Sequence, residues 1–348
     1  MITNVDLKIA IISMIFGLLA GSIGVLVVLR KNALIGDSIA HAALPGVALS
    51  FLVFECKELY ILLPGAALAA LVAMVTFNFI KKHSKIKNDT ILALILSGFF
   101  GLGIILIRII TNSKIASAAG LKDFIYGQAS TMMFKDMITI LIIFVIAYSL
   151  LLLLWKEFKV FIFNAEFAET LGFNNKLLNG IFSFLVVLVI IAGIQMLGVV
   201  LLSAMIIAPA VAIKQFSDKY HNNFIFGGVI GAVSGFCGSI ISSLLKIPTG
   251  PSIIVFLSLV VLLSLLFAPK KGLVFNHIKH RLYIKKVEKL NLLLAIYKKE
   301  VIYENSRTFN ALLTDGYIVK KDKIYIISER GLQKIRMISE TEEAINEL

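Results

Sequence analysis

Apolar runs long enough to cross a lipid bilayer constrain this chain more than any other feature of its sequence. A helix needs roughly 20 consecutive apolar residues to span the hydrocarbon core. We count nine such runs, at 8–29, 33–54, 60–80, 91–111, 136–155, 177–196, 197–213, 223–244 and 252–268. The sixth and seventh runs touch near Gly198, so either could be a short or broken helix. Because a bilayer offers the backbone no hydrogen bonds, the sequence predicts an all-α polytopic membrane protein with about nine transmembrane helices.

Charged residues gather after the last apolar run and divide the chain into two parts. Hydrophobic residues make up 59% of the sequence and charged residues only 16%, with a mean hydropathy of +0.93. Soluble domains are far less apolar. Residues 270–348 hold 16 of the 34 Lys and Arg and 10 of the 21 Asp and Glu. We therefore expect a transmembrane domain at 1–269 and a small cytoplasmic domain at 270–348.

Lysine and arginine follow alternate apolar runs and predict how the chain is oriented. Basic residues come directly after the first, third, fifth, seventh and ninth runs. If the runs alternate in direction, these loops share one side, which the positive-inside rule assigns to the cytoplasm. The N-terminus is then outside and the C-terminal domain inside. The loop at 112–135 disagrees, because it carries Lys114, Lys122 and Lys135 on the outer side.

Asp37 and His41 are the most informative polar residues, because they lie four positions apart inside the second apolar run. A helix places them on one face, one turn apart. Ionisable groups at membrane depth are costly unless they serve a purpose. The pair could be a transient cation site facing a central pathway, a structural hydrogen bond that orients the helix, or a proton relay.

Two ligands from one helix are too few to hold a metal ion. A pore between two subunits would supply the same pair twice, giving two carboxylates and two imidazoles. This mixed set suits Mn²⁺, Fe²⁺ or Zn²⁺ better than Ca²⁺ or Cu⁺. The two cysteines, Cys56 and Cys237, have no metal-site spacing. A tight structural zinc centre is therefore not expected, and sparse ligation suits a site that must also release its ion.

Proline and glycine mark local features within the runs. Pro45 and Gly46 follow one turn after His41. Proline removes a backbone hydrogen bond and usually kinks a helix, so this position could be a hinge or only a passive shape. Glycines at four-residue spacing in the first and eighth runs predict close helix packing. They are Gly17, Gly21, Gly227, Gly231 and Gly235.

The second run and its surroundings resemble the metal-importing ABC permeases, which take zinc, manganese or iron from an external metal-binding protein. The sequence Gly-Asp-Ser-Ile-Ala-His-Ala-Ala-Leu-Pro-Gly at 36–46 is similar to the most distinctive segment of that family. Residues 198–210, which contain Pro209, are similar to a later pore-lining helix, and residues 247–251 resemble the turn before the last span. The likeness covers about 1–268 in order.

The resemblance implies an assembly in the bacterial cytoplasmic (inner) membrane. Two permease chains, either identical copies or paralogues, would work with two cytoplasmic ATP-binding subunits and one extracytoplasmic metal-binding protein. Asp37 and His41 would line the translocation path as metal ligands, with Pro45, Gly46 and Pro209 as pore or hinge residues. The His-Ala-Ala-Leu-Pro-Gly form resembles the manganese and iron members more than the zinc members, and manganese is the expected ion, with zinc or iron as alternatives. No permanently bound cofactor is expected, since the ion is the cargo.

A second segment bears on how ATP hydrolysis would be coupled to transport at this site. The sequence has no G-x-x-x-x-G-K-[ST] loop, so the chain cannot be its own P-loop ATPase and is not expected to be an enzyme. Residues 163–173 predict a short amphipathic helix that Asn164 can cap, Glu166 favours and Gly172 can close. The segment, which includes Ala168, resembles the coupling helix of ABC permeases. It could instead lie on lipid.

The sequence of the C-terminal domain predicts a mixed α+β module. Its pattern indicates helices at 278–297, 310–313 and 329–338 and a β-hairpin at 316–327. This order resembles a winged-helix module, and we expect a regulatory or docking role against the ATPase. Nucleic acid is not the expected partner, although such modules often bind DNA. His277 and His280 could hold a sensing metal, but histidines beside lysines are usually solvated.

Three functions fit these observations. The first is the permease subunit of an ATP-driven importer of divalent metal ions, working by alternating access. The second is a proton-coupled secondary metal carrier that uses Asp37 and His41 as a relay. The third is a membrane-bound metal sensor that signals through its C-terminal domain. The expected coupling helix favours the first function.

Overall fold

A computed structural model describes residues 4–55, 59–112, 134–269, 271–298, 307–321 and 324–336. The chain divides into two compact units, Met1–Lys271 and Gly272–Leu348. The boundary lies two residues after the expected one at 269.

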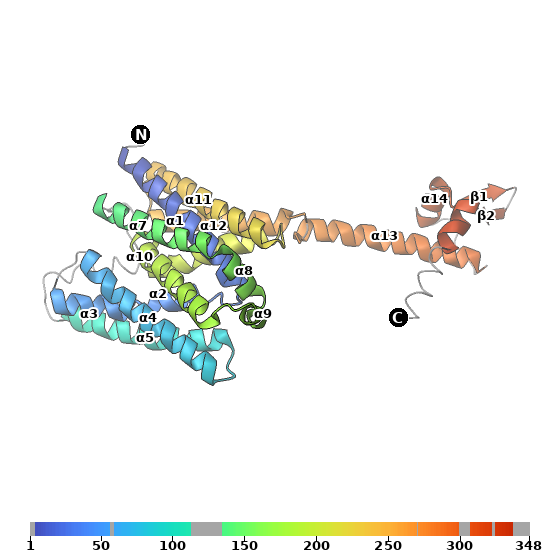
Figure 1. The fold of residues 1–348 in the computed structure, drawn as a ribbon. Coiled ribbons are helices and arrows are strands. Elements are labelled where there is room, and N and C mark those ends of the chain that lie inside the picture. Colours follow the sequence, from blue (N-terminus) through green and yellow to red (C-terminus); the bar gives the residue numbers. More distant parts are fainter. Residues whose placement is uncertain are drawn as a thin grey trace. The chain divides into compact units, whose positions relative to one another are not determined.

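The described residues of the first unit form helices joined by short connections (Figure 1). A helix satisfies its backbone hydrogen bonds within one segment, as a segment that crosses a bilayer requires. The helices are α1 (Asn4–Leu29), α2 (Ile35–Ala42), α3 (Leu44–Phe54), α4 (Leu59–His83), α5 (Asn88–Asn112), α7 (Phe134–Leu153), α8 (Trp155–Phe163), α9 (Ala165–Thr170), α10 (Asn175–Lys214), α11 (Tyr220–Leu245) and α12 (Thr249–Phe267).

Eight helical segments within the described residues are long and apolar enough to cross a membrane. The run expected at 197–213 forms a shorter apolar helix, Leu201–Lys214. It is the second half of α10, which is interrupted at Gly198, where φ is 75° and ψ is 167°. Glycine adopts this conformation without the steric cost that other residues meet. The predicted polytopic all-α class is confirmed, and the expected break near Gly198 accounts for the shortness of the seventh run, at 197–213.

Glycines bring α1 and α11 into backbone contact. A Cβ atom added to Gly17 would lie 2.2 Å from the carbonyl oxygen of Gly231, and one added to Gly21 would lie 2.3 Å from that of Gly227. Gly235 has an equally close backbone neighbour on α1. Only hydrogen fits at these positions, which confirms the predicted packing of small residues.

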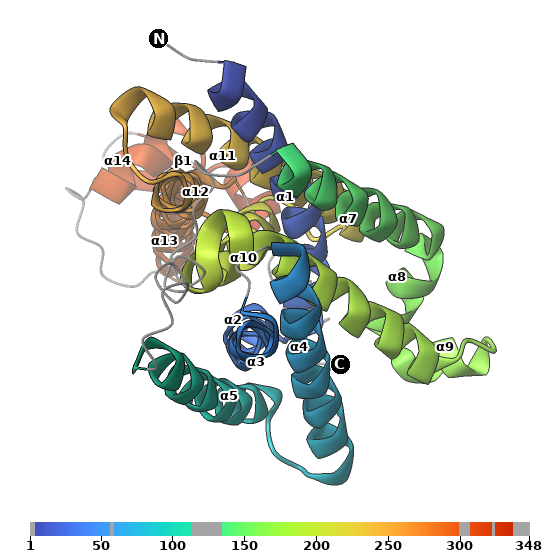
Figure 2. The same ribbon diagram turned by 90° about the vertical axis from the view of Figure 1, so that its left-hand side faces the viewer.

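Helix α2 lies inside a ring of neighbours, and this placement defines the surroundings of the candidate site. It packs against α10, α5 and α4 (Figure 2). Its core-facing side is fully buried at Ile35, Ile39 and Ala42. The remaining face carries Asp37 and His41, both of them partly exposed.

Hydrogen bonds join the helix ends that the charge pattern places in the cytoplasm. Arg30, after α1, donates to Asn179 near the start of α10, and Asn88, at the start of α5, donates to Asn32. Three loops expected on one side therefore meet at one end of the unit. Which side of the membrane this is stays a prediction. Lys114 and Lys122, in the loop that disagrees, lie outside the described residues.

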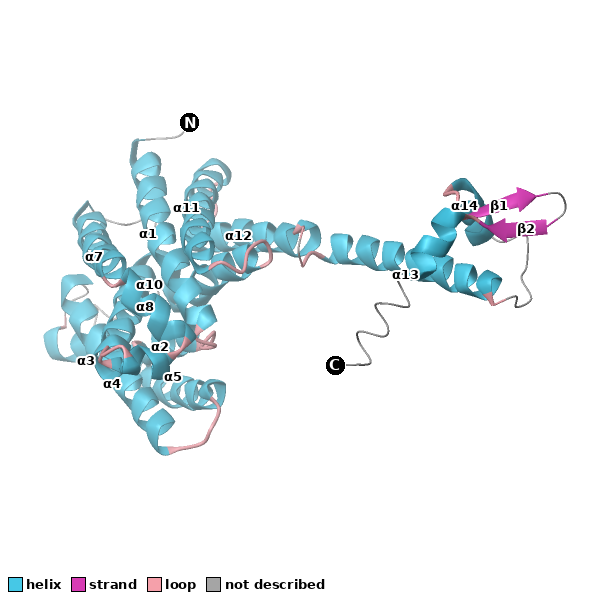
Figure 3. Ribbon diagram, turned by 45° about the vertical axis from the view of Figure 1, so that its right-hand side comes forward, coloured by secondary structure: helices cyan, strands magenta, loops and turns pink. Residues whose placement is uncertain are grey.

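The second unit contains α13 (Leu273–Tyr297), α14 (Arg307–Thr314) and an antiparallel hairpin of β1 (Ile318–Lys321) and β2 (Ile324–Ile327) (Figure 3). Residues 329–336 are helical. A small core joins these elements through Leu293, Phe309, Leu312, Ile318 and Ile335. The elements fall in the predicted order, although α13 begins five residues before the expected position 278. The turn at 322–323 and the expected helix end at 337–338 lie outside the described residues. Membership of the winged-helix class stays a prediction.

Candidate metal site and coupling segment

Asp37 and His41 meet on the open face of α2, as their spacing predicts. The Nε2 atom of His41 lies 3.4 Å from the Oδ1 atom of Asp37. The His41 side chain is 14% exposed and the Asp37 side chain 33% exposed, so neither side chain is fully enclosed by the described residues. A carboxylate oxygen and an imidazole nitrogen at this separation suit a shared transition-metal ion.

One ring nitrogen of His41 has no partner. Its Nδ1 atom is buried and makes no hydrogen bond within the described residues. A neutral imidazole has one donor and one acceptor nitrogen, so an unpaired ring nitrogen remains whichever tautomer is present. Buried polar atoms are normally satisfied, and an orphan calls for an explanation.

The ring of His41 is held from the side by Phe100 of α5. The two rings meet edge to face, with centroids 4.8 Å apart and an interplanar angle of 82°. This geometry is a favoured one for aromatic pairs. Phe100 was not among the expected site residues, because the contact joins two separate apolar runs and leaves no signal in local spacing.

The described part of the chain supplies only these two ligands. No group of three or more His, Cys, Asp and Glu side chains within it could hold a metal ion. His277 and His280 are exposed on α13. A metal held at Asp37 and His41 therefore needs further ligands from water, from a second copy or from a partner.

The expected pore or hinge residues occupy different positions. Pro45 lies in the first turn of α3, where a missing N–H costs little, and Ala43 joins α2 to α3 with helical angles of −72° and −23°. A Cβ atom added to Gly46 would lie 2.0 Å from the carbonyl oxygen of Gly65, so this glycine has a packing role. Pro209 lies inside α10, after its break. A hinge role for these residues stays a prediction.

The segment expected to couple to an ATPase forms the short helix α9. The Oδ1 atom of Asn164 accepts the N–H of Phe167 at 2.9 Å, which caps the helix start. Gly172, with φ of 86°, follows its end. The side chain of Asn175 donates to the carbonyl oxygen of Ala165 at 2.7 Å and ties α9 to the start of α10.

The surface of α9 and its flanks is apolar on one side and acidic on the other. Ala168 is fully buried and anchors the helix, while Glu166 is exposed. Phe163, Phe167 and Leu171 are each more than half exposed. Large exposed apolar side chains grouped in this way are typical of a docking surface.

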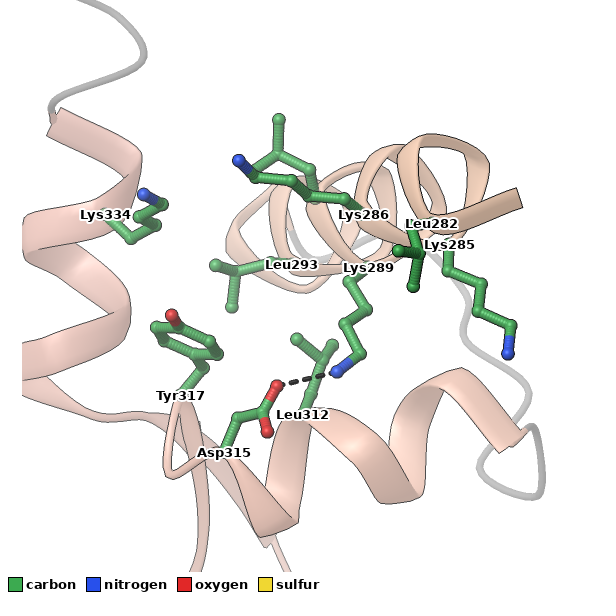
Figure 4. Close-up of a pocket in the computed structure, with 10 residues that line it drawn as sticks. Leu282, Lys285, Lys286, Lys289, Leu293, Leu312, Asp315, Tyr317 and Lys334 are labelled. Atoms are coloured by element: carbon green, nitrogen blue, oxygen red, sulfur yellow. Dashed lines mark hydrogen bonds and ion pairs between the residues drawn. The ribbon is translucent and has the colours of Figure 1, made fainter. Parts of the chain in front are cut away.

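The second unit holds a separate cavity of about 360 Å³ (Figure 4). It is lined by Lys285, Lys286, Lys289 and Lys334 together with leucines of α13 and α14. Lys289 pairs with Asp315 at 2.7 Å. The cavity carries a net positive charge and none of the expected metal ligands.

The membrane unit combines helices long enough to cross a bilayer with a partly exposed Asp–His pair on α2. Residues 4–268 match the model of the ABC 3 transport family, and the chain belongs to this family. It is a metal-transport permease and a multi-pass integral membrane protein, and ATP hydrolysis belongs to a separate subunit. The expected resemblance is thereby confirmed.

Named relatives carry different metals in their names. The chain is 37% identical over 313 residues to the manganese transport system membrane protein MntC of Bacillus subtilis, covering 90% of this chain and 71% of that protein. It is 35% identical to the zinc transport system membrane protein TroC of Treponema pallidum, covering 76% and 89%. It is 30% identical to a probable iron transport system membrane protein of Haemophilus influenzae, covering 78% and 93%.

A solved structure shares the fold of the membrane unit. It is PsaBC from Streptococcus pneumoniae in complex with Fab, with a TM-score of 0.68 and 28% identity. The match covers 77% of this chain and 94% of the matched chain.

Proposed function

We propose that this chain is the membrane-spanning subunit of an ATP-driven importer of divalent transition-metal ions. Manganese is the proposed physiological ion, and zinc and iron are the alternatives. The observation that carries the proposal is the Asp37–His41 pair, whose Nε2 and Oδ1 atoms lie 3.4 Å apart on partly exposed side chains. An oxygen and a nitrogen ligand favour Mn²⁺, Fe²⁺ or Zn²⁺ over harder or softer ions.

The ion passes through a path that two permease chains share. Each chain contributes one Asp37 and one His41, which gives a four-ligand site from two sparse halves. The second chain is either an identical copy or a paralogue. An extracytoplasmic metal-binding protein delivers the ion, and a cytoplasmic ATP-binding subunit docks on α9. The assembly resides in the bacterial inner membrane, with the N-terminus outside and the second unit in the cytoplasm.

Transport proceeds by alternating access. ATP binding closes the ATP-binding subunits and moves the segments docked on them. The site at Asp37 and His41 then changes from facing the outside to facing the cytoplasm. Sparse ligation favours this cycle, because an ion held by few protein ligands is released readily.

Uptake by reconstituted vesicles tests this proposal. Asp37→Asn and His41→Ala each remove one ligand, and we expect either to reduce ATP-dependent Mn²⁺ accumulation at least 20-fold without impairing assembly. Asp89→Asn and His83→Ala make the same chemical changes at exposed positions and serve as controls. Normal uptake by both site variants would contradict the proposal. Uptake that needs no ATP-binding subunit would favour a proton-coupled carrier instead.

A further inference from the structure

Arg30 holds a partly buried positive charge between two helices. Its guanidinium carbon lies 4.6 Å from the ring centroid of Phe161, on α8, and 4.6 Å from that of Phe182, on α10. One guanidinium nitrogen, Nη2, donates to the Oδ1 atom of Asn179 at 3.0 Å. Burial lowers the pKa of Arg30 to about 10, so the side chain remains charged at neutral pH.

A contribution to folding stability does not by itself explain why an arginine occupies this position. No carboxylate within the described residues forms an ion pair with it. Moving a cation out of water is costly, and two aromatic faces and one amide compensate only in part. A neutral side chain of similar length would fill the same space without that cost.

Side-chain hydrogen bonds around Arg30 join the connection between α1 and α2 to three helices, α10, α4 and α5. Asn179 donates to Asn78 of α4 at 3.0 Å, and Asn78 donates to Ser183 at 3.3 Å. Two residues after Arg30, the side chain of Asn32 accepts from Asn88 of α5 at 2.8 Å. These bonds attach the short connection between α1 and α2 to the neighbouring helices.

This connection lies between the two proposed functional segments. Phe161 is three residues before Asn164, the cap of α9, so α8 leads directly into α9. The backbone carbonyl of Asn32 accepts the N–H of Ile35, the first residue of α2, at 3.0 Å. Asp37 follows within the same turn of that helix.

We propose that Arg30 is a positioning residue that transmits movement of α8 and α9 to α2. The planar guanidinium stacks on a ring of α8 and bonds to α10, while its backbone leads directly into the helix of the metal site. The proposal rests on the proposed function, because it takes α9 as the docking point of an ATP-binding subunit. It assigns Arg30 to coupling and not to metal binding.

The test compares Mn²⁺ uptake with ATP hydrolysis in vesicles that contain the complete transporter. We expect Arg30→Gln to keep equilibrium Mn²⁺ binding and basal ATP hydrolysis within about twofold of wild type, and its unfolding temperature not to fall. The number of ions taken up per ATP hydrolysed should fall about tenfold. Arg30→Lys should recover less than half of this loss, because a lysine cannot stack and donate in one plane. Arg108→Gln, at an exposed arginine of α5, is the control.

Phe161→Leu provides a second variant if Arg30→Gln does not assemble. This substitution removes the α8 ring that Arg30 contacts and leaves Arg30 and Asn179 in place. It should therefore also lower the number of ions taken up per ATP hydrolysed. Unchanged ions per ATP in the assembled variant would overturn the proposal. So would a parallel loss of binding, hydrolysis and thermal stability, which indicates a structural role. The proposed function fails by a different result, uptake by wild type without ATP, and the inference would fall with it.

Discussion

At the scale of single residues, the proposed ion site consists of two side chains in the second membrane segment. Asp37 and His41 could be paired from sequence, because a spacing of four residues is a local property of a helix. Phe100, which orients the His41 ring, could not be found in this way, since it belongs to another segment. Arg30 was interpreted only as one of the basic residues that orient the chain. Its aromatic neighbours, Phe161 and Phe182, come from positions more than 130 residues away.

Removal of the Phe100 ring should leave His41 in place but less well oriented for binding a metal ion. Phe100→Ala takes away the edge-to-face support of His41. Groups that orient a metal ligand typically contribute a factor of about ten or more to affinity, so the Mn²⁺ concentration for half-maximal uptake should rise about tenfold.

Uptake measured across a series of Mn²⁺ concentrations checks this expectation, with Phe99→Ala as the control for lost volume on the same helix. An equal effect of both variants would show that Phe100 acts through packing alone.

At the scale of helices, run length and composition were sufficient to predict most of the membrane unit. Apolar runs of spanning length became helices because a bilayer leaves the backbone few alternatives. The break at Gly198 was expected from the short spacing of two runs, and φ of 75° explains why glycine occupies it. The tight α1–α11 contact was visible as glycines four residues apart. The hydrogen bonds that join helix ends could not be predicted from the sequence, because they depend on neighbours in three dimensions.

The glycine contact leads to a stability prediction with a matched control. Gly231→Ala places a methyl group 2.2 Å from the carbonyl oxygen of Gly17, so the two backbones must separate. We expect a loss of about 1–3 kcal/mol, which is the usual cost of overpacking.

Gly98→Ala is the control, because nothing lies within 4 Å of its added Cβ atom. Its unfolding temperature should stay the same or rise slightly, as alanine is the better helix former. Thermal unfolding in detergent measures both variants. Similar shifts in the two proteins would show that the α1–α11 contact tolerates a methyl group.

At the scale of the whole molecule, we propose that one chain holds half of a metal site. The described residues offer no cluster of three metal-binding side chains, and the Asp37–His41 pair is partly open. The two compact units were foreseeable from the shift in charge at the end of the last apolar run. The lysine-lined cavity of the second unit was not, because its walls come from separate elements that meet only after folding.

The number of ions bound by the purified permease tests the central claim most directly. Equilibrium binding of Mn²⁺ should reach one ion for every two chains, because each chain contributes one carboxylate and one imidazole. The ion should be lost in Asp37→Asn, while Asp89→Asn binds as wild type does. One ion per chain, or full binding by Asp37→Asn, would contradict the account.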